Sequence, residues 1–357
     1  MKISRLSTLL DDAPDLLPAD GTVLVLGPRA GSDLSALPAD RVRAVQGFRP
    51  DHDALAAQGY KVTPEPEGND HAAALVILPR SRAEGRAMVA EAAARVRPGA
   101  PVWIDGQKTD GIDTMLRDLR GRAEVPGSLV KAHGRIFSFA GGDAAPFADW
   151  QAQPLTPTVG FRTYPGVFSA EAVDRGSLLL AGALPADLKG RVADLGAGWG
   201  WLAAQVLARP GVKSVDLVEA DHLALACARA NVTDPRAVFH WLDATQFKPE
   251  RVCDVVVMNP PFHQGRAADP SLGASFIAAA ARVLSPAGVL WMVANRHLPY
   301  EAALTAAFRE VQELPGDGGF KLFRASHPHR APAPGSVASP RRGTSNSPHR
   351  GVARRRR

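Results

Sequence analysis

Apolar and polar positions in the second half of the chain follow two periodicities in turn. Short, mostly apolar runs such as 215–218 and 255–258 are typical of buried strands, and Ala- and Leu-rich stretches with helical spacing lie between such runs. The alternation extends from Val192 to Phe308 and closes with a further strand pattern at 320–324. It predicts an α/β fold with a mostly parallel, doubly wound sheet, in which the last strand enters antiparallel.

The first half of the chain repeats this pattern. Residues 25–31 align with 194–200 at an offset of 169, and further matches follow in the same order with offsets that rise to 188. Chance similarity between Ala-rich helices explains any one match, but the ordered set predicts a duplicated fold with small insertions. The further matches are 42–46 with 215–219, 75–79 with 256–260, 92–96 with 279–283, and Trp103 with Trp291.

The two copies differ at their polar positions. Apolar strand residues are kept in the first copy, whereas the polar groups expected to hold ligands are replaced. The replaced pairs are Asp194 and Val25, Glu219 and Gln46, and Asn259 and Leu78. The first copy is therefore expected to be a degenerate domain that serves as a scaffold or an RNA platform.

Length and local composition suggest where the domains end. A chain of 357 residues exceeds a typical domain of about 100–200 residues. The stretch 141–157 is rich in Gly and Pro and has little periodicity, as expected of a linker. We expect a degenerate domain at 1–150, a second domain at 158–325, and a tail at 326–357.

The tail has a composition of its own. Residues 326–357 are rich in Pro, Ser, Gly and His, contain eight Arg and no acid, and are expected to be disordered. Subtracting these eight charges from the formal net charge of +6 leaves −2 for the remainder, so the basic character belongs to the tail. An Arg-rich tail can bind RNA phosphates. A lineage-specific extension or a shifted reading frame would have the same appearance.

Composition otherwise indicates a globular protein, with 45% hydrophobic and 22% charged residues. Cys227 and Cys253 lack the spacing of a disulfide framework or a zinc site and are expected to be buried thiols. The N-terminus lacks the apolar segment of a signal peptide, and no run approaches about 18 apolar residues. We therefore expect a cytoplasmic protein without a membrane partner.

A glycine-rich turn follows the predicted strand at 192–195. Gly196, Gly198 and Gly200 would let the backbone approach a ligand at the start of the next helix. Glu219 ends the following strand, where a ribose diol is commonly held. A dinucleotide enzyme uses the same acid, but Asp194 beside the turn suits a cationic amino-acid end better than a pyrophosphate. The pattern therefore favours S-adenosylmethionine over NAD as the cofactor.

The sequence Asn259-Pro260-Pro261-Phe262 follows a buried strand and predicts a pocket for a planar, amino-bearing substrate. The Asn259 amide and the Pro260 carbonyl can accept hydrogen bonds from an exocyclic amine, and Phe262 offers a stacking face. An Asn-Pro pair is also an ordinary turn signal, and Phe262 would equally suit a core.

Four polar residues stand at predicted strand ends and are expected to share one rim of the sheet, because ligands of such sheets collect at the carboxyl ends of the strands. They are Asp194, Glu219, Asp243 and Asn259. For each residue taken singly, a helix cap or a turn is the alternative.

Residues 160–325 resemble the catalytic domain of the RsmC and RlmG group of ribosomal RNA guanine-N2 methyltransferases. The glycine turn is widespread among methyltransferases, but the segments 164–169 and 293–300 are much more restrictive. One departure lies in the turn, which carries Trp199 and has Ala197 where relatives often have Cys; this is expected to alter packing around the cofactor without removing a ligand. The matching segments are 164–169, 192–200, 259–263, 293–300 and 319–325.

The resemblance implies a class I methyltransferase fold and a noncatalytic first half. It implies methyl transfer from S-adenosylmethionine to the N2 amine of a guanine in ribosomal RNA, with no metal. Asn259, Pro260 and Phe262 would handle the base. The cofactor contacts would be Asp194, Gly196, Gly198, Glu219, Asp243 and Asn259.

The substrate is expected to be 16S rRNA or the small ribosomal subunit, acted on by a monomer. Residues 263–264 and 296–297 resemble the large-subunit enzyme, so 23S rRNA is an alternative. A glutamine-N5 protein methyltransferase would use the same Asn-Pro-Pro-aromatic logic, but the duplicated front half argues against it. A noncatalytic RNA-binding factor would show decay in both copies, whereas the second copy retains its polar positions.

Overall fold

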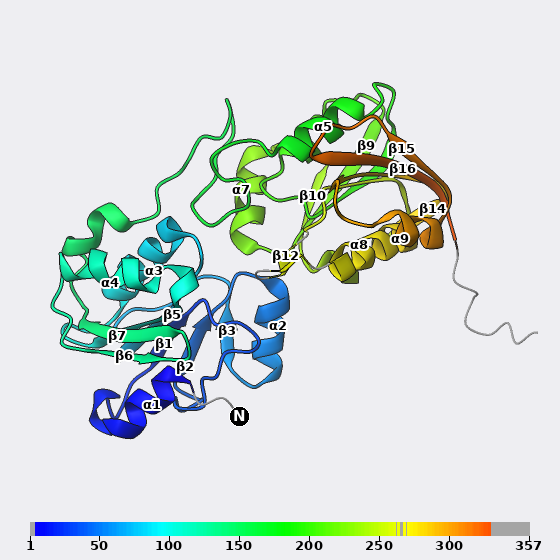
Figure 1. Cartoon of the computed structure of the whole chain (residues 1–357). Helices are drawn as coiled ribbons and strands as arrows, with labels where there is room; N and C mark the ends of the chain where they lie inside the picture. The colour runs from blue at the N-terminus through cyan, green and yellow to red at the C-terminus, as the bar shows by residue number, and fades with distance from the viewer. Residues whose placement is uncertain (1–3, 262, 265–266, 269, 330–357) are drawn as a thin grey trace, which may run out of the picture.

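The computed structural model describes residues 4–261, 263–264, 267–268 and 270–329. Each half of the chain forms its own α/β unit around a seven-stranded sheet, and the two units lie side by side (Figure 1). The strand order is β3-β2-β1-β4-β5-β7-β6 in the first sheet and β10-β9-β8-β11-β14-β16-β15 in the second. These orders are the same when the strands are numbered in chain order within each seven-stranded sheet, so the predicted duplicated fold is confirmed.

The first unit contains four α-helices and seven strands among its described residues. They are α1 (Arg5–Asp12), β1 (Val23–Leu26), β2 (Val42–Val45), α2 (Arg49–Ala57), β3 (Lys61–Thr63), β4 (Ala73–Ile77), α3 (Arg82–Arg95), β5 (Pro101–Gln107), α4 (Ile112–Arg120), β6 (Ser128–Lys131) and β7 (Gly134–Ala140), with short 3₁₀ turns at Pro14–Leu16, Lys108–Asp110 and Ala145–Trp150.

The second unit repeats the alternation and adds a small two-stranded sheet. Its described elements are α5 (Arg175–Ala183), β8 (Gly190–Leu195), α6 (Trp201–Leu207), β9 (Val212–Glu219), α7 (His222–Asn231), β10 (Ala237–Trp241), a 3₁₀ turn at Ala244–Gln246, β11 (Cys253–Met258), β12 (His263–Gln264), β13 (Ala267–Ala268), α8 (Pro270–Val283), β14 (Leu284–Asn295), α9 (Glu301–Ala307), β15 (Phe308–Leu314) and β16 (Phe320–Pro328).

The second sheet has the predicted mixture of directions. Strands β8 to β11 and β14 pair in parallel, whereas β16 pairs antiparallel with both β14 and β15. One face packs on α8 and α9 through residues such as Ile277 and Leu304. The other face packs on α5, α6 and α7 through residues such as Leu180 and Val206. Because both faces are covered, strands such as β11 are apolar along most of their length.

Strand register allows the two copies to be superposed residue by residue. Val25 pairs with Ala44 in the first sheet and Asp194 with Leu217 in the second, so Gln46 stands where Glu219 stands in the second copy. Leu75 pairs with Trp103, and Val257 with Trp291, so the two tryptophans are equivalent as predicted.

The register corrects one predicted match. Val25 pairs with Leu75, and Asp194 pairs with Val257, so Leu75 corresponds to Val257 and not to Val256. The residue equivalent to Asn259 is therefore Ile77 and not Leu78. Apolar strand residues of similar size align about equally well one position apart, which explains the error. The replacement is apolar in either register.

The two copies contact each other through equivalent segments. The Arg49 N–H donates to the Ala220 carbonyl at 2.8 Å, and the His222 N–H donates to the Gly47 carbonyl at 2.9 Å. At the offset of 173 that relates Gln46 to Glu219, Gly47 corresponds to Ala220 and Arg49 to His222, so the two bonds are equivalent. This contact forms an antiparallel bridge directly after β2 and β9, so the first copy supports the loop that follows Glu219.

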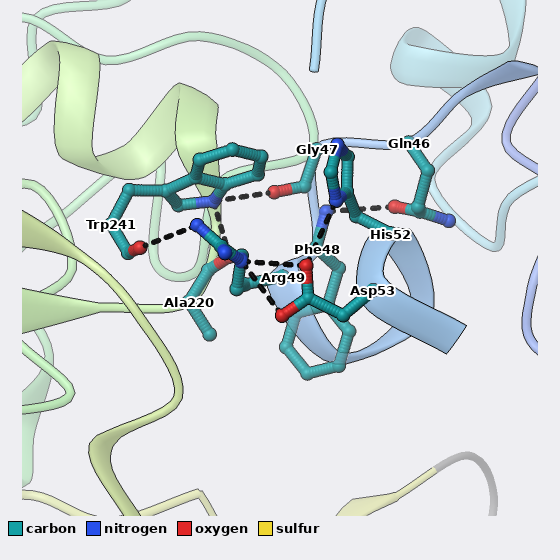
Figure 2. Close-up of polar contacts among 8 residues, drawn as sticks. All are labelled: Gln46, Gly47, Phe48, Arg49, His52, Asp53, Ala220 and Trp241. Atoms are coloured by element: carbon teal, nitrogen blue, oxygen red, sulfur yellow. Dashed lines mark hydrogen bonds and ion pairs between the residues drawn. The ribbon is translucent and has the colours of Figure 1, made fainter. Parts of the chain in front are cut away.

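Trp241 at the end of β10 completes this contact (Figure 2). Its indole N–H donates to the carbonyls of Gly47 at 3.0 Å and Ala220 at 2.9 Å, which belong to different copies. The Arg49 guanidinium stacks 4.8 Å from the centre of the Trp241 ring and donates to the Trp241 carbonyl at 3.3 Å. Side-chain and backbone contacts therefore hold the same two loops together.

The last strand extends beyond the predicted domain end at residue 325. β16 continues to Pro328, which pairs with Phe308, and Ser326 is buried and donates to Glu310 at 2.7 Å. The predicted tail therefore begins too early, because Pro, His and Ser in its first residues resemble a disordered segment in composition. Residues 330–357 lie outside the described residues. No helix in the described part of the chain is long and apolar enough to cross a membrane.

Candidate active site

The glycine turn between β8 and α6 has the backbone geometry that its sequence predicts. Gly196, Gly198 and Gly200 have φ values of 81°, 55° and 86°, a region that glycine enters without strain. A Cβ at Gly200 would lie 2.9 Å from a Val232 methyl and 3.1 Å from the Ala228 Cβ. The turn therefore brings the start of α6 close to α7 and exposes backbone at the edge of a cavity.

Asp194 is a buried carboxyl for which the described residues supply no hydrogen-bond partner at normal distance and angle. Its side chain is 1% exposed, and no hydrogen bond of normal geometry reaches either carboxyl oxygen from the described residues. Burial and, to a smaller extent, the Glu219 carboxylate raise the pKa of Asp194 to about 8. A buried carboxylate without a partner is costly to a fold. This residue therefore fits a cationic group supplied by a ligand.

Glu219 lies beside the same turn. Its carboxyl oxygens accept hydrogen bonds from the N–H groups of Gly198 and Asp221, both at 2.8 Å. Burial raises the pKa of Glu219 to about 7, and the nearby Asp221 carboxyl contributes in the same direction. In the first copy, Gln46 accepts the equivalent bond from Phe48 N–H at 2.7 Å, but its amide donates to the Pro28 carbonyl at 2.6 Å. Both polar atoms of the Gln46 amide are therefore hydrogen-bonded within the first copy.

Asn259 follows β11 and is held by two side chains from the start of α5. Its Nδ2 donates to Asp174 Oδ2 at 2.7 Å and to Ser177 Oγ at 3.0 Å. Pro260, the next residue, is buried. Phe262, the predicted stacking residue, lies outside the described residues.

A single cavity joins several of the predicted residues. It is lined by Asp194, Gly196, Gly198 and Asn259, together with Asp174 and Ser177 of the α5 start and Phe168, Val173, Ala197, Trp199, Trp201 and Leu202. The structure therefore brings Asp194, the glycine turn and Asn259 together around one space. Glu219 reaches the same turn through Gly198.

Asp243 is a predicted site residue that does not belong to this arrangement. It follows β10 at the same end of the sheet, but it does not line the cavity. One of its carboxyl oxygens accepts from the Thr245 N–H and hydroxyl, both at 2.8 Å, and caps a 3₁₀ turn. The capping alternative is therefore observed, and the second carboxyl oxygen is the group left to contact a ligand.

The segment 163–173 covers the glycine turn. Trp199 is buried against Val167, and its indole N–H donates to the Phe168 carbonyl at 3.2 Å. Phe161 meets the Trp199 ring edge-on at 5.5 Å. Trp199, which departs from the usual turn sequence, therefore fastens this covering segment over the cavity.

Sequence reasoning missed Asp174 and Ser177. An Asp three residues before a Ser at a helix start is an ordinary N-cap signal, and nothing in the sequence links it to Asn259, which lies 85 residues away. The expectation of buried thiols is confirmed, because Cys227 and Cys253 are buried, and burial raises their pKa values to about 11 and about 12.

The strand order, the glycine turn after the first strand of the second copy and the rim residues together define a class I methyltransferase. Residues 158–324 match the family model of the methyltransferase small domain.

Comparison with known proteins identifies the family. Ribosomal RNA small subunit methyltransferase C of Hahella chejuensis is 30% identical over 267 residues, which cover 70% of this chain and 76% of the relative. The protein of the same name from Idiomarina loihiensis is 28% identical over 321 residues, which cover 86% and 94%. This chain belongs to the family of ribosomal RNA small subunit methyltransferase C.

A solved structure agrees over nearly the whole chain. The T. thermophilus 16S rRNA N2 G1207 methyltransferase (RsmC), in complex with AdoMet and guanosine, is similar with a TM-score of 0.73 and 27% identity. The similarity covers 91% of this chain and 93% of that structure. Both copies of the duplicated fold are therefore common to the two proteins.

Proposed function

We propose that this protein transfers a methyl group from S-adenosylmethionine to the exocyclic N2 amine of a guanine in 16S rRNA. The observation that carries the proposal is the position of Asn259, whose amide borders the same cavity as the unpartnered carboxyl of Asp194. An acceptor for an amine and an anion for a cationic cofactor thus lie within one site. The names of the relatives favour the small subunit over the large one.

On the cofactor side, this chain supplies charge and backbone. The ionised Asp194 would hold the cationic amino-acid end, and the turn at Gly196 and Gly198 would let the ligand approach the backbone closely. Glu219 would accept from the ribose hydroxyls, and Asp243 would contact the base. S-adenosylmethionine supplies an activated methyl group on a sulfonium, so the protein mainly has to align it with the acceptor.

On the substrate side, the chain supplies acceptors. The Asn259 Oδ1 and the Pro260 carbonyl would accept from the two hydrogens of the guanine N2 amine. The same acceptors would stabilise the positive charge that develops on the nitrogen as it is methylated. Phe262 would stack on the displaced base. Neither Pro260 nor Pro261 has a backbone N–H. These two residues therefore place no hydrogen-bond donor against the N–H groups of the guanine amine.

The first copy would act as a scaffold. Its equivalents of Asp194 and Glu219 are Val25 and Gln46, and Gln46 is already satisfied by its own turn. We propose that it supports the catalytic copy through the Arg49 and Trp241 contacts and offers a platform for RNA. The partner would be the small subunit or its rRNA, acted on by a monomer in the cytoplasm.

The substitution Asn259→Ala tests this function. Loss of the amide acceptor is expected to lower the rate of methyl transfer by about 10²–10³-fold, as for removal of one group that stabilises developing charge. The dissociation constant of AdoMet should change much less, because Asp194 and the turn remain. Asn69→Ala, which removes an exposed asparagine of the first copy, is the matched control. Near-normal turnover of Asn259→Ala would contradict the assignment.

A further inference from the structure

We infer that Asp174 and Ser177 are positioning residues that fix which face of the Asn259 amide is presented to the substrate. Both hydrogens of Asn259 Nδ2 are donated to them, at 2.7 Å and 3.0 Å. The face that remains presents Oδ1, which only accepts hydrogen bonds. The inference rests on the proposed function, because it concerns how the same site selects an amine.

An asparagine amide needs such a constraint. Its oxygen and its NH₂ group have almost the same shape, and a half-turn of the terminal torsion exchanges an acceptor for two donors. A donor facing the guanine amine would oppose the two N–H groups of the substrate. With Asp174 behind it, the half-turn would place Oδ1 against a carboxylate and lose the hydrogen bond to Asp174, whereas the Ser177 hydroxyl could still donate to Oδ1. The acceptor orientation is therefore strongly preferred before any substrate binds.

Asp174 is itself fixed by the fold. It is the N-cap of α5, and Oδ2, the oxygen that accepts from Asn259, also accepts from the Ser177 N–H at 2.9 Å. Ser177 lies in the first turn of the same helix. A Cβ at Gly176 would lie 3.0 Å from the Phe320 ring of β16, and Leu180 is fully buried. Because α5 packs closely on the sheet, the two acceptors have little freedom to move.

The charge on Asp174 has a second effect. A hydrogen bond to a carboxylate is stronger than one to a neutral acceptor, and it polarises the donor amide. The Asn259 Oδ1 therefore carries more negative charge than it would alone. This oxygen is the group that faces the amine as it becomes cationic, so the effect is greatest in the transition state and should appear in kcat more than in KM.

A double-mutant cycle tests the inference. Full-length Asp174→Ala, Asn259→Ala and the double variant are compared by single-turnover methylation of small-subunit rRNA with labelled AdoMet. We expect Asp174→Ala to slow the reaction by about 10–100-fold, the effect of a misplaced catalytic contact, while the AdoMet dissociation constant stays within about threefold. In the Asn259→Ala background the same change should have almost no further effect, because there is no amide left to orient.

Three further variants control for the loss of the helix cap in Asp174→Ala. Asp174→Asn keeps a cap and an oxygen acceptor and should recover most of the lost rate. Ser81→Ala removes a side-chain N-cap elsewhere in the fold, at the start of α3 in the first copy, where the serine accepts from Glu84 N–H, and should leave the rate unchanged. Ser177→Ala keeps the Asp174 cap, and it is expected to slow methylation less than Asp174→Ala does and to have almost no effect in the Asn259→Ala background. This second cycle keeps the test available if the Asp174→Ala protein fails to fold.

The outcomes are distinct. If Asp174→Ala slows the reaction equally with and without Asn259, Asp174 acts independently and the inference is overturned, although the proposed function stands. A rate for Asp174→Asn as low as that for Asp174→Ala would overturn it as well. If Asn259→Ala alone retains normal turnover, the proposed function and the inference both fail.

Discussion

Replacing Asp194 with asparagine should make the ligand-free protein more stable and remove its affinity for AdoMet. The Asp194 carboxyl is buried without a hydrogen-bond partner among the described residues, and its pKa is raised from 3.8 to about 8. The folded protein therefore binds this proton more tightly than the unfolded chain. The resulting destabilisation is absent below pH 3.8, grows as the pH rises, and is complete above about pH 8.

The size of the effect follows from this shift. At pH 7 the carboxyl is about three pH units above its unfolded pKa, and each unit is worth about 1.4 kcal/mol, so its burial costs about 4 kcal/mol. An asparagine amide at the same place avoids ionisation, but its unpartnered groups cost about 1–3 kcal/mol. We expect a net gain of about 1–3 kcal/mol at pH 7 and almost none at pH 5, where the ionisation cost is only about 1–2 kcal/mol.

Calorimetric unfolding of the ligand-free proteins between pH 5 and pH 8 measures this gain. The unfolding temperature of Asp194→Asn should exceed that of the wild type increasingly as the pH rises, while titration calorimetry should detect no AdoMet binding. Asp187→Asn, which changes an exposed carboxyl of the same unit, is the matched control. An Asp194→Asn protein that is no more stable at pH 8 than the wild type, or that binds AdoMet normally, would refute the reasoning.

Three further changes test the roles of the two copies and of the chain end. Glu219→Gln gives the second copy the residue found at Gln46, and it should weaken AdoMet binding at least tenfold, whereas the wild-type chain should bind one AdoMet; a second site of similar affinity would contradict the degenerate first copy. Deleting 330–357 should leave the unfolding temperature and the chemical step unchanged and, if the Arg residues contact phosphates, flatten the salt dependence of RNA binding. Deleting 326–357 should lower the unfolding temperature as well, because it removes the buried Ser326 and the end of β16; equal stability of the two truncations would show that these strand residues contribute nothing.

The sequence predicted the parts of this protein that depend on local patterns. Apolar periodicity gave the strands and helices, and the rule that strand ends share a rim brought Asp194 and Asn259 to one cavity. The replacement of polar residues in the first copy could also be predicted from the sequence. Val25 and Gln46 stand at the positions that the strand register makes equivalent to Asp194 and Glu219. These features are properties of short segments or of their order.

Features that depend on distant packing could not be predicted. The contacts of Asp174 and Ser177 with Asn259 join segments 85 and 82 residues apart, and a helix cap has the same sequence with or without such a contact. The pairing of the loops at Gly47 and Ala220 depends on how two folded units dock. The end of β16 was misplaced because strand pairing with Phe308 outweighs the composition of Ser326 to Pro328.

The most direct test of the central claim is to identify the methylated product. The purified protein is incubated with small and large ribosomal subunits from cells lacking the protein, together with AdoMet that carries a deuterated methyl group. The rRNA nucleosides are then separated and identified by mass spectrometry. We predict a labelled N2-methylguanosine in 16S rRNA that is lost with Asn259→Ala. Label confined to 23S rRNA, to another base or to ribosomal protein would contradict this prediction, as would no label at all.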